Sequence, residues 1–239
     1  MSLVITEKLI QRQINHWNRF REFLKDEQVD EQAQRGPVIT ISRLSGSGGR
    51  TLATRLADRL GITLHDQSLV DQIAKDRKLE SKVVSQLDET AINQAALWIT
   101  GVLTRRIFLK DEYHTALVRV VTNLAAGGNA IFLGRGANLI LGDNATLRIR
   151  VVASWTNRLN RIMARTGLSR AEARALLQET DRNRRDFIRK VFKVQPNAPE
   201  NFDLVLNSDR MTPECMLETA TVALISTQSA GPARMPSQV

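Results

Sequence analysis

Cysteine, histidine and long apolar runs are scarce in this sequence. The single cysteine, Cys215, excludes an intrachain disulfide and a zinc cluster built on cysteines, and the three histidines are too scattered to indicate a metal centre. No apolar run approaches the roughly 20 residues that a membrane-spanning helix needs. We therefore expect a cytoplasmic protein that does not cross a membrane.

Aromatic residues are also few, while positive charge is abundant and concentrated in one segment. Aromatic side chains make up 5% of the chain, and the formal net charge is +9. Between Arg148 and Lys193, eleven arginines and two lysines stand against four acidic residues, so this segment carries the whole excess. Such a cluster binds a small polyanion in a pocket or a nucleic acid along a surface, or it is only a solvated basic face. Because few aromatic side chains are present for base stacking, nucleic acid is the less favoured partner.

The two ends of the chain differ from its centre. Residues 3–25 carry apolar side chains at helical spacing, and a polar segment ending in Gly36-Pro37 follows them. We expect residues 1–30 to form an amphipathic helical appendage that packs on the core or on a second subunit, which would give a homodimer. Residues 37–225 are expected to form the core domain and residues 226–239 a disordered tail rich in Ser and Pro.

From Pro37 onward, short apolar strands alternate with helical segments, which predicts a parallel sheet covered on both faces. The expected strands are Val38–Ser42, Ile62–His65, Ala130–Leu133, Leu147–Val152 and Leu204–Asn207. The expected helices are Thr51–Leu60, a long stretch from about Leu69 to Ala126, Trp155–Arg165, one from Arg170 behind a Ser169-x-x-Glu172 capping box, and one that Thr212-Pro213 begins.

A glycine-rich turn, ISRLSGSGGRT at residues 41–51, follows the first strand. Aligned on its Gly-Arg-Thr, the phosphate-loop pattern GxxxxGK[ST] fails at two positions, because Leu44 replaces the first glycine and Arg50 the lysine. Backbone N–H groups at such a strand–helix junction nevertheless form an anion-binding nest. The residues expected to hold phosphates are Gly46, Ser47, Gly48, Gly49, Arg50 and Thr51, with the Thr51 hydroxyl as a Mg²⁺ ligand. The alternative is a plain tight turn between a strand and a helix.

Two further strand ends carry candidate ligand-binding residues. Arg135 lies between Gly134 and Gly136 directly after the strand AIFL, where parallel sheets bind ligands, and its guanidinium could clamp a phosphate. The alternative is a turn with an exposed arginine. Asp66, after the second strand, could contact an acceptor or a metal-bound water, or it could only cap the next helix.

Two arginine-bearing helices follow the fourth strand and resemble a hairpin that can close. Arg158, Arg161 and Arg165 share one face of the first helix by their spacing, and Arg182, Arg185 and Arg189 are spaced similarly near the end of the second. Guanidinium groups that arrive on closure would stabilise a transferring phosphoryl group. The alternative is an ordinary helical hairpin whose arginines face water.

Taken in order, these motifs resemble the cytidylate kinase-like family, relatives of bacterial cytidylate kinases among the P-loop nucleoside monophosphate kinases. The resemblance runs from about Val38 to Leu224. Its carriers are ITISRLSGSGGRTLATRLADRLG, LHDQSLVDQIA, AIFLGRGANLIL, LRIRVVASWTNRLNRIMARTGLSRAEA, ETDRNRRDFIRKVF and FDLVLNSDRMTPE.

The resemblance implies an α/β P-loop NTPase fold, with a five-stranded parallel sheet in the order 2-3-1-4-5 and flanking helices. It also implies a helical acceptor-binding insert at about residues 69–127 and an arginine-rich lid at about residues 158–195. ATP would be the donor and Mg²⁺ the cofactor, and Arg135 would bind the acceptor phosphate with Asp66 and Arg161 near it. The residues given catalytic roles are Arg50, Arg158, Arg182 and Arg185. Leu133 stands where true cytidylate kinases have an aspartate that supports Mg²⁺.

Two functions follow from this resemblance. The first is ATP-dependent phosphoryl transfer to a small acceptor, above all a nucleoside monophosphate such as CMP or dCMP. The alternative, favoured by the leucine at position 133, is a non-catalytic nucleotide-binding regulatory module that engages a partner through its N-terminal helix.

Overall fold

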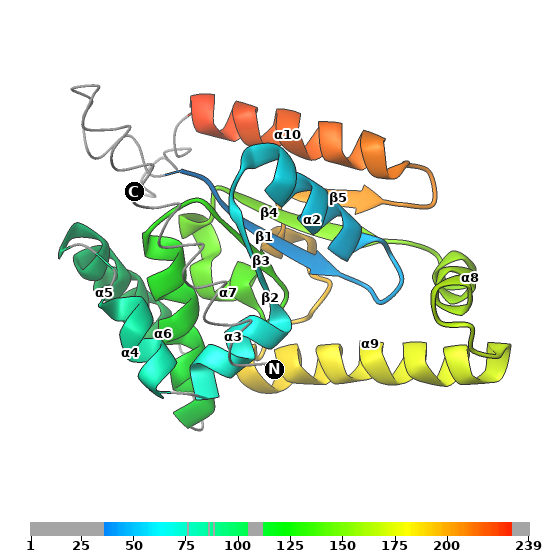
Figure 1. The fold of residues 1–239 in the computed structure, drawn as a ribbon, viewed down its shortest axis with the longest axis horizontal. Helices are drawn as coiled ribbons and strands as arrows, with labels where there is room; N and C mark the ends of the chain where they lie inside the picture. Colours follow the sequence, from blue (N-terminus) through cyan, green and yellow to red (C-terminus); the bar gives the residue numbers. More distant parts are fainter. Residues whose placement is uncertain (1–35, 76, 86, 88, 105–111, 231–239) are drawn as a thin grey trace, which may run out of the picture.

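The structure is a computed structural model that describes residues 36–75, 77–85, 87, 89–104 and 112–230. The expected appendage at residues 1–30 and residues 231–239 of the expected tail lie outside the described residues, so both remain predictions. Helices cover both faces of a single sheet, as expected from the alternating pattern (Figure 1).

The sheet has five parallel strands in the order β2-β3-β1-β4-β5, which confirms the expected fold class and strand order. The strands are β1 (Val38–Arg43), β2 (Thr63–Asp66), β3 (Ala130–Leu133), β4 (Leu147–Val152) and β5 (Leu204–Asn207). Because β1 is central, β3 and β4 end on either side of the loop that follows it. This order brings three strand ends, far apart in sequence, to one edge of the sheet.

Nine helices are present among the described residues. They are α2 (Gly49–Leu60), α3 (Gln67–Lys75), α4 (Arg77–Val84), α5 (Glu89–Thr104), α6 (Glu112–Ala126), α7 (Ala137–Leu141), α8 (Trp155–Thr166), α9 (Arg170–Phe192) and α10 (Pro213–Ala230), with 3₁₀ turns at Gly142–Asn144 and Pro199–Asn201. The short helix α7 was not expected, because five residues are too few to show a helical period. The helix α10 continues past residue 225, where the tail was expected to begin.

Two apolar layers hold these helices against the sheet. Ile39 and Ile41 of β1 face α2 and α10, whereas Val38 faces the layer formed with α3, α6 and α7. The alternation follows from the period of two in a strand, and β1 is buried on both faces. In Figure 1, α2 and α10 lie on one side of the sheet and α3, α6 and α7 on the other.

The insert between β2 and β3 differs from the single long helical stretch that we expected. Its described residues form four helices, α3 to α6. Polar residues interrupt the apolar period between α4 and α5. At this interruption the Ser85 hydroxyl donates to the Lys82 carbonyl oxygen (3.0 Å) and α4 ends. Asp66 begins the insert as a cap: its Oδ1 accepts the backbone N–H of Leu69 at the start of α3.

The expected helical hairpin is present as α8 and α9. Gly167 ends α8 in the left-handed conformation, and the Ser169–Glu172 capping box begins α9 as expected. Leu159 and Ile162 of α8 pack on Ala173 and Leu177 of α9. The hairpin therefore has its own small apolar core, and α9 runs from the sheet out to α8 (Figure 1). Within the described part of the chain, no helix is long and apolar enough to cross a bilayer.

His65, in the buried strand β2, should make stability depend on pH. Its ring stacks on Phe132 (centroids 5.1 Å apart), neither ring nitrogen has a hydrogen-bond partner among the described residues, and burial lowers its pKa to about 4. The unfolded chain therefore takes up this proton near pH 6.5, whereas the folded state resists it until about pH 4. We expect the free energy of unfolding to fall by up to about 3 kcal/mol between pH 7 and pH 4 on this account.

Urea unfolding of the wild type and of His65→Phe at pH 7.5, 6 and 5 would measure this effect. The carboxylates titrate in both proteins, so the difference between the two curves isolates His65. The variant should lose clearly less stability on acidification; parallel losses would contradict the prediction.

Candidate active site

The loop after β1, residues 44–48, is held in a defined shape by its own side chains and by β4. The Ser47 hydroxyl donates to the carbonyl oxygens of Leu44 (2.9 Å) and Val151 (3.0 Å). Gly46 has a positive φ of 75° and leaves space that a Cβ would take, 2.8 Å from the Arg158 carbonyl oxygen. No side chain caps the N-terminus of α2 behind Gly48. The first turn of α2 therefore presents backbone N–H groups to an anion, as a phosphate-binding loop must.

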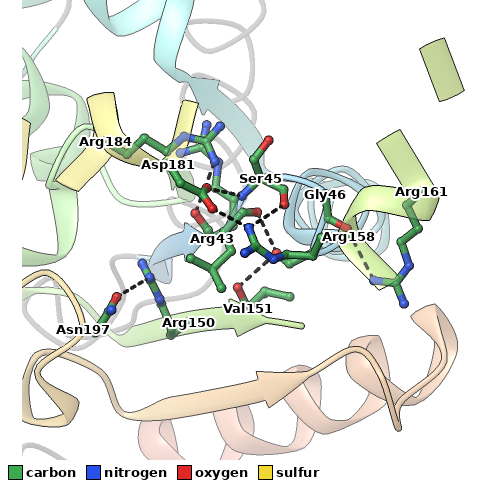
Figure 2. Close-up of polar contacts among 12 residues, drawn as sticks. Arg43, Ser45, Gly46, Arg150, Val151, Arg158, Arg161, Asp181, Arg184 and Asn197 are labelled. Atoms are coloured by element: carbon green, nitrogen blue, oxygen red, sulfur yellow. Dashed lines mark hydrogen bonds and ion pairs between the residues drawn. The ribbon is translucent and has the colours of Figure 1, made fainter. Parts of the chain in front are cut away.

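The α8–α9 hairpin, which the sequence leads us to expect as a lid, holds this loop through an ion pair between its two helices. Asp181 of α9 accepts the backbone N–H of Ser45 (3.0 Å) through one oxygen and the guanidinium of Arg158 (2.5 Å) through the other. Arg158 of α8 also donates to the Ser45 carbonyl oxygen (3.2 Å), and both charged side chains are buried. Figure 2 shows the three residues meeting between the lid and the loop. The structure thus places Arg158 at the loop, as expected of a lid arginine.

Arg161, one turn further along α8, reaches the same loop from the other side. It donates to the Ser208 hydroxyl and carbonyl oxygens (both 2.7 Å) and to the Gly46 carbonyl oxygen (3.5 Å). These contacts lie at the loop and the end of β5, whereas Arg135, which we expected to share a phosphate with Arg161, lies after the end of β3.

Arg50 and Asp66 form an ion pair between the start of α2 and the end of β2. Arg50 is 61% exposed in its side chain and donates to Asp66 Oδ2 (3.1 Å). Partial burial would raise the pKa of the Asp66 carboxyl, but hydrogen bonds from Ser68, Leu69 and Arg50 together lower it. Asp66 is therefore the N-cap of α3, which was one of the two roles expected for it, and it also pairs with Arg50. Its lowered pKa keeps the carboxyl ionised at neutral pH.

Arg135 is set into the turn after β3 by three neighbours. Its Nε donates to Asp71 Oδ1 (2.5 Å) and its Nη2 pairs with Asp71 Oδ2; the Tyr113 hydroxyl donates to the same carboxylate (2.7 Å). The guanidinium also stands over the Phe187 ring of α9, 5.1 Å from its centroid. These contacts fix Arg135 between the insert and the lid, where an acceptor would lie.

A cavity of about 400 Å³ opens between these groups at the carboxyl edge of the sheet. Five arginines line it, and Asp181 is the one acidic side chain among its lining residues. The arginines are Arg43, Arg135, Arg150, Arg184 and Arg185. Arg135 and Arg185 were expected here, whereas Arg182 is exposed on α9 and does not line the cavity.

Sequence reasoning missed three of these arginines. Arg43 and Arg150 lie in strands, and Arg184 lies next to the expected Arg185 on α9. Arg150 donates to Asn197 Oδ1 (2.7 Å), and Arg184 donates to the Arg43 carbonyl oxygen (3.4 Å) (Figure 2). Burial lowers the pKa of both guanidiniums. Arg150 had a usable signal, because it is a charged residue at an alternate position of a strand next to the glycine-rich turn.

The described residues offer little to a Mg²⁺ ion on their own. They contain no cluster of three or more acidic, histidine or cysteine side chains, and Leu133 at the end of β3 is buried in the apolar core. The Thr51 hydroxyl lies in the exposed first turn of α2. Mg²⁺ is commonly held through substrate phosphates, water and one or two side chains. The site therefore fits an ion that arrives with ATP, where it would neutralise charge on the phosphates.

Breaking the Asp181–Arg158 pair should lower stability strongly, because removing one partner leaves a buried charge unpaired. We expect Asp181→Ala to lower the free energy of unfolding by about 3–5 kcal/mol, and the double variant Asp181→Leu/Arg158→Met to recover much of it. Glu179→Ala, an exposed site on the same helix, is the control and should change it by less than about 0.5 kcal/mol. Urea unfolding followed by circular dichroism measures all three; a loss below 1 kcal/mol for Asp181→Ala would contradict the assignment.

Comparison with known proteins agrees with this geometry. The sequence model of the cytidylate kinase-like family matches residues 38–210. The cytidylate kinase of Methanopyrus kandleri is 26% identical over 183 residues, covering 72% of this chain and 85% of that protein. A uronate isomerase of Corynebacterium glutamicum is 35% identical over 95 residues, but this match covers 39% of the chain and only 18% of that protein.

Among solved structures, an uncharacterized protein from Eubacterium ventriosum superposes with a TM-score of 0.59 at 22% identity, over 82% of this chain and 100% of that chain. This likeness supports the fold. The family match spans the sheet, the insert and the lid. The chain therefore belongs to the cytidylate kinase-like family, whose members are nucleoside monophosphate kinase-like phosphotransferases.

Proposed function

We propose that the chain transfers the γ-phosphoryl group of ATP to a small phosphorylated acceptor, with CMP and dCMP as the first candidates. The observation that carries this proposal is the cavity at the carboxyl edge of the sheet, where arginines from β1, the β3–α7 turn, β4 and α9 converge. Its volume of about 400 Å³ lies in the range of small-molecule sites. Its excess of guanidinium groups suits a reaction between two phosphate groups.

The proposal divides the site between donor and acceptor. The ATP phosphates would lie on the backbone N–H groups of residues 46–51, at the N-terminus of α2. The acceptor phosphate would lie against Arg135, which Asp71 and Phe187 hold in place. The lid arginines Arg158 and Arg185 would complete the site from α8 and α9, while roles for Arg161 and Arg182 stay predictions.

The orientation of the basic residues supports a small ligand over a nucleic acid. Arg148 pairs with Asp203, Arg158 with Asp181, and Arg150 and Arg184 line the cavity. These four are engaged within the fold, whereas others, such as Arg165, Arg174 and Arg189, are exposed. The two that line the cavity are placed to bind a small anion there.

A second candidate function is a non-catalytic nucleotide-binding module. The observation that favours it is Leu133, which is 1% exposed and packed in the core at the strand end where a carboxylate would support Mg²⁺. The proposed partner contact of this module, like a homodimer, would use the N-terminal helix, which lies outside the described residues. Nucleotide binding without phosphoryl transfer would favour this candidate over the first.

An ADP-release assay with ATP, Mg²⁺ and a panel of nucleoside monophosphates tests the proposed reaction. We expect turnover with CMP or dCMP, and we expect Arg135→Ala to lower kcat/KM for that acceptor about 100-fold, because a charged hydrogen-bonding partner of its phosphate is lost. Arg59→Ala is the matched control: Arg59 pairs with Glu218 between α2 and α10, on the opposite face of the sheet from the insert and lid. No ADP release with any acceptor would overturn the proposal.

A further inference from the structure

Arg43 is the last residue of β1, and two glycines leave the space that its side chain occupies. A Cβ at residue 49 would lie 2.6 Å from the Cβ of Arg43, and a Cβ at residue 134 would lie 2.0 Å from its Nη1. The Cβ of Arg43 therefore lies beside the start of α2, and its guanidinium lies against the turn after β3. A side chain at either glycine would displace Arg43 from this path.

The backbone of the loop shows which residue stands in the lysine position of the phosphate-loop pattern. Gly48 has a φ of 83°, in the left-handed region that favours glycine, and α2 begins at Gly49, which has no positive φ. The second glycine of GxxxxGK[ST] is therefore Gly48, one residue earlier than the alignment used above. In this register Arg43 stands in the place of the first glycine and Gly49 in the place of the lysine.

This alignment shows which residue can supply the positive charge that the lysine carries in the usual pattern. The lysine position is occupied by Gly49, which has no side chain. The first-glycine position, where the pattern has no side chain, is occupied by Arg43. The Arg43 side chain therefore begins beside the lysine position, and its guanidinium lies against the turn after β3. Arg50, by contrast, is exposed and already paired with Asp66.

No carboxylate in the described part of the chain pairs directly with Arg43, although Asp66 is near enough to act on its charge. Within the described part of the chain, its side chain forms no ion pair or hydrogen bond, and it lines the cavity. Burial and the nearby Arg184, Arg50 and Arg135 lower its pKa to about 9, in spite of Asp66. A half-buried cation beside other cations is unfavourable until an anion joins it. The cavity is where that anion can enter.

We propose that Arg43 is a catalytic residue that replaces the lysine of the phosphate loop and binds the phosphoryl group in transfer. This inference rests on the proposed function and names a residue that the expected site did not contain. In the reaction, an acceptor phosphate oxygen forms a bond to the γ-phosphorus while the bond to the bridging oxygen of ADP breaks and its electron pair leaves with ADP. The acceptor oxygen is already ionised, so Arg43 neither gives nor takes a proton and only stabilises charge.

Isothermal titration with ADP and with the non-hydrolysable analogue AMP-PNP, both with Mg²⁺, tests this role without requiring turnover. We expect Arg43→Ala to weaken AMP-PNP binding at least about 30-fold and ADP binding less than about threefold, because only AMP-PNP carries the third phosphate. Arg59→Ala should change neither. Arg50→Ala should leave the preference for AMP-PNP over ADP within about threefold of the wild-type value, since Asp66 already pairs with Arg50.

Exchanging the residue types at positions 43 and 49 tests whether Arg43 acts through its positive charge or only through its contribution to the structure. Gly49→Lys alone should lose AMP-PNP binding, because its Cβ would collide with Arg43. Arg43→Gly alone should lose it as well, because the cation is gone. The double variant Arg43→Gly/Gly49→Lys restores the first glycine and the lysine of the usual pattern, with Arg50 still at its Ser/Thr position. It should therefore recover AMP-PNP binding to within about tenfold of the wild type and should also recover turnover with ATP and CMP.

The outcomes distinguish this inference from the function on which it rests. If wild-type protein binds neither nucleotide, both are overturned. If it binds and transfers, but Arg43→Ala keeps its preference for AMP-PNP or the double variant is as weak as Arg43→Gly, the role of Arg43 is overturned alone. If Arg43→Ala loses the preference and the double variant regains it, while no acceptor turns over, Arg43 binds the third phosphate and the transfer reaction fails.

Discussion

Repulsion among arginines at one edge of the sheet is the constraint on which the rest of the site depends. Parallel strands in the order β2-β3-β1-β4-β5 direct Arg43, Arg135 and Arg150 toward the same cavity, and α9 adds Arg184 and Arg185. Positive charges that line one partly buried cavity repel each other and oppose folding, unless carboxylates or a ligand compensate them. The lowered pKa of Arg43, due to burial and then to three neighbouring arginines, is the direct sign of this repulsion.

Carboxylates compensate some of these arginines and leave others to a ligand. Asp71 pairs with Arg135, Asp181 with Arg158, and Asp66 with Arg50, each at a junction between the sheet and a surrounding element. Asp181 has a second task, because it also accepts the Ser45 N–H and so joins the lid to the phosphate loop. The positive charge that no carboxylate pairs with, above all that of Arg43, makes the cavity suited to a phosphate group.

The fold could be predicted from the sequence more fully than the site. Strands such as Ala130–Leu133 are short apolar runs bounded by glycine, and the Ser169–Glu172 box marks its helix start locally, so both were found. The insert was mistaken for one stretch because its breaks are polar residues without Gly or Pro. Arg184 was missed in favour of Arg182, because the lid face that meets the loop is chosen by tertiary packing and not by spacing. Arg43 was missed because its meaning depends on the φ of Gly48 and on two absent Cβ atoms, neither of which the sequence displays.

The most direct test of this account is a crystal structure of the protein with ADP, Mg²⁺, aluminium fluoride and CMP, which together mimic the transferring phosphoryl group. The account predicts that the fluoroaluminate lies within hydrogen-bond distance of the Arg43 guanidinium and of backbone N–H groups at residues 46–50, with the CMP phosphate against Arg135. A fluoroaluminate bound by Arg50 instead, with Arg43 more than about 5 Å away, would contradict it, because a hydrogen bond needs about 3 Å.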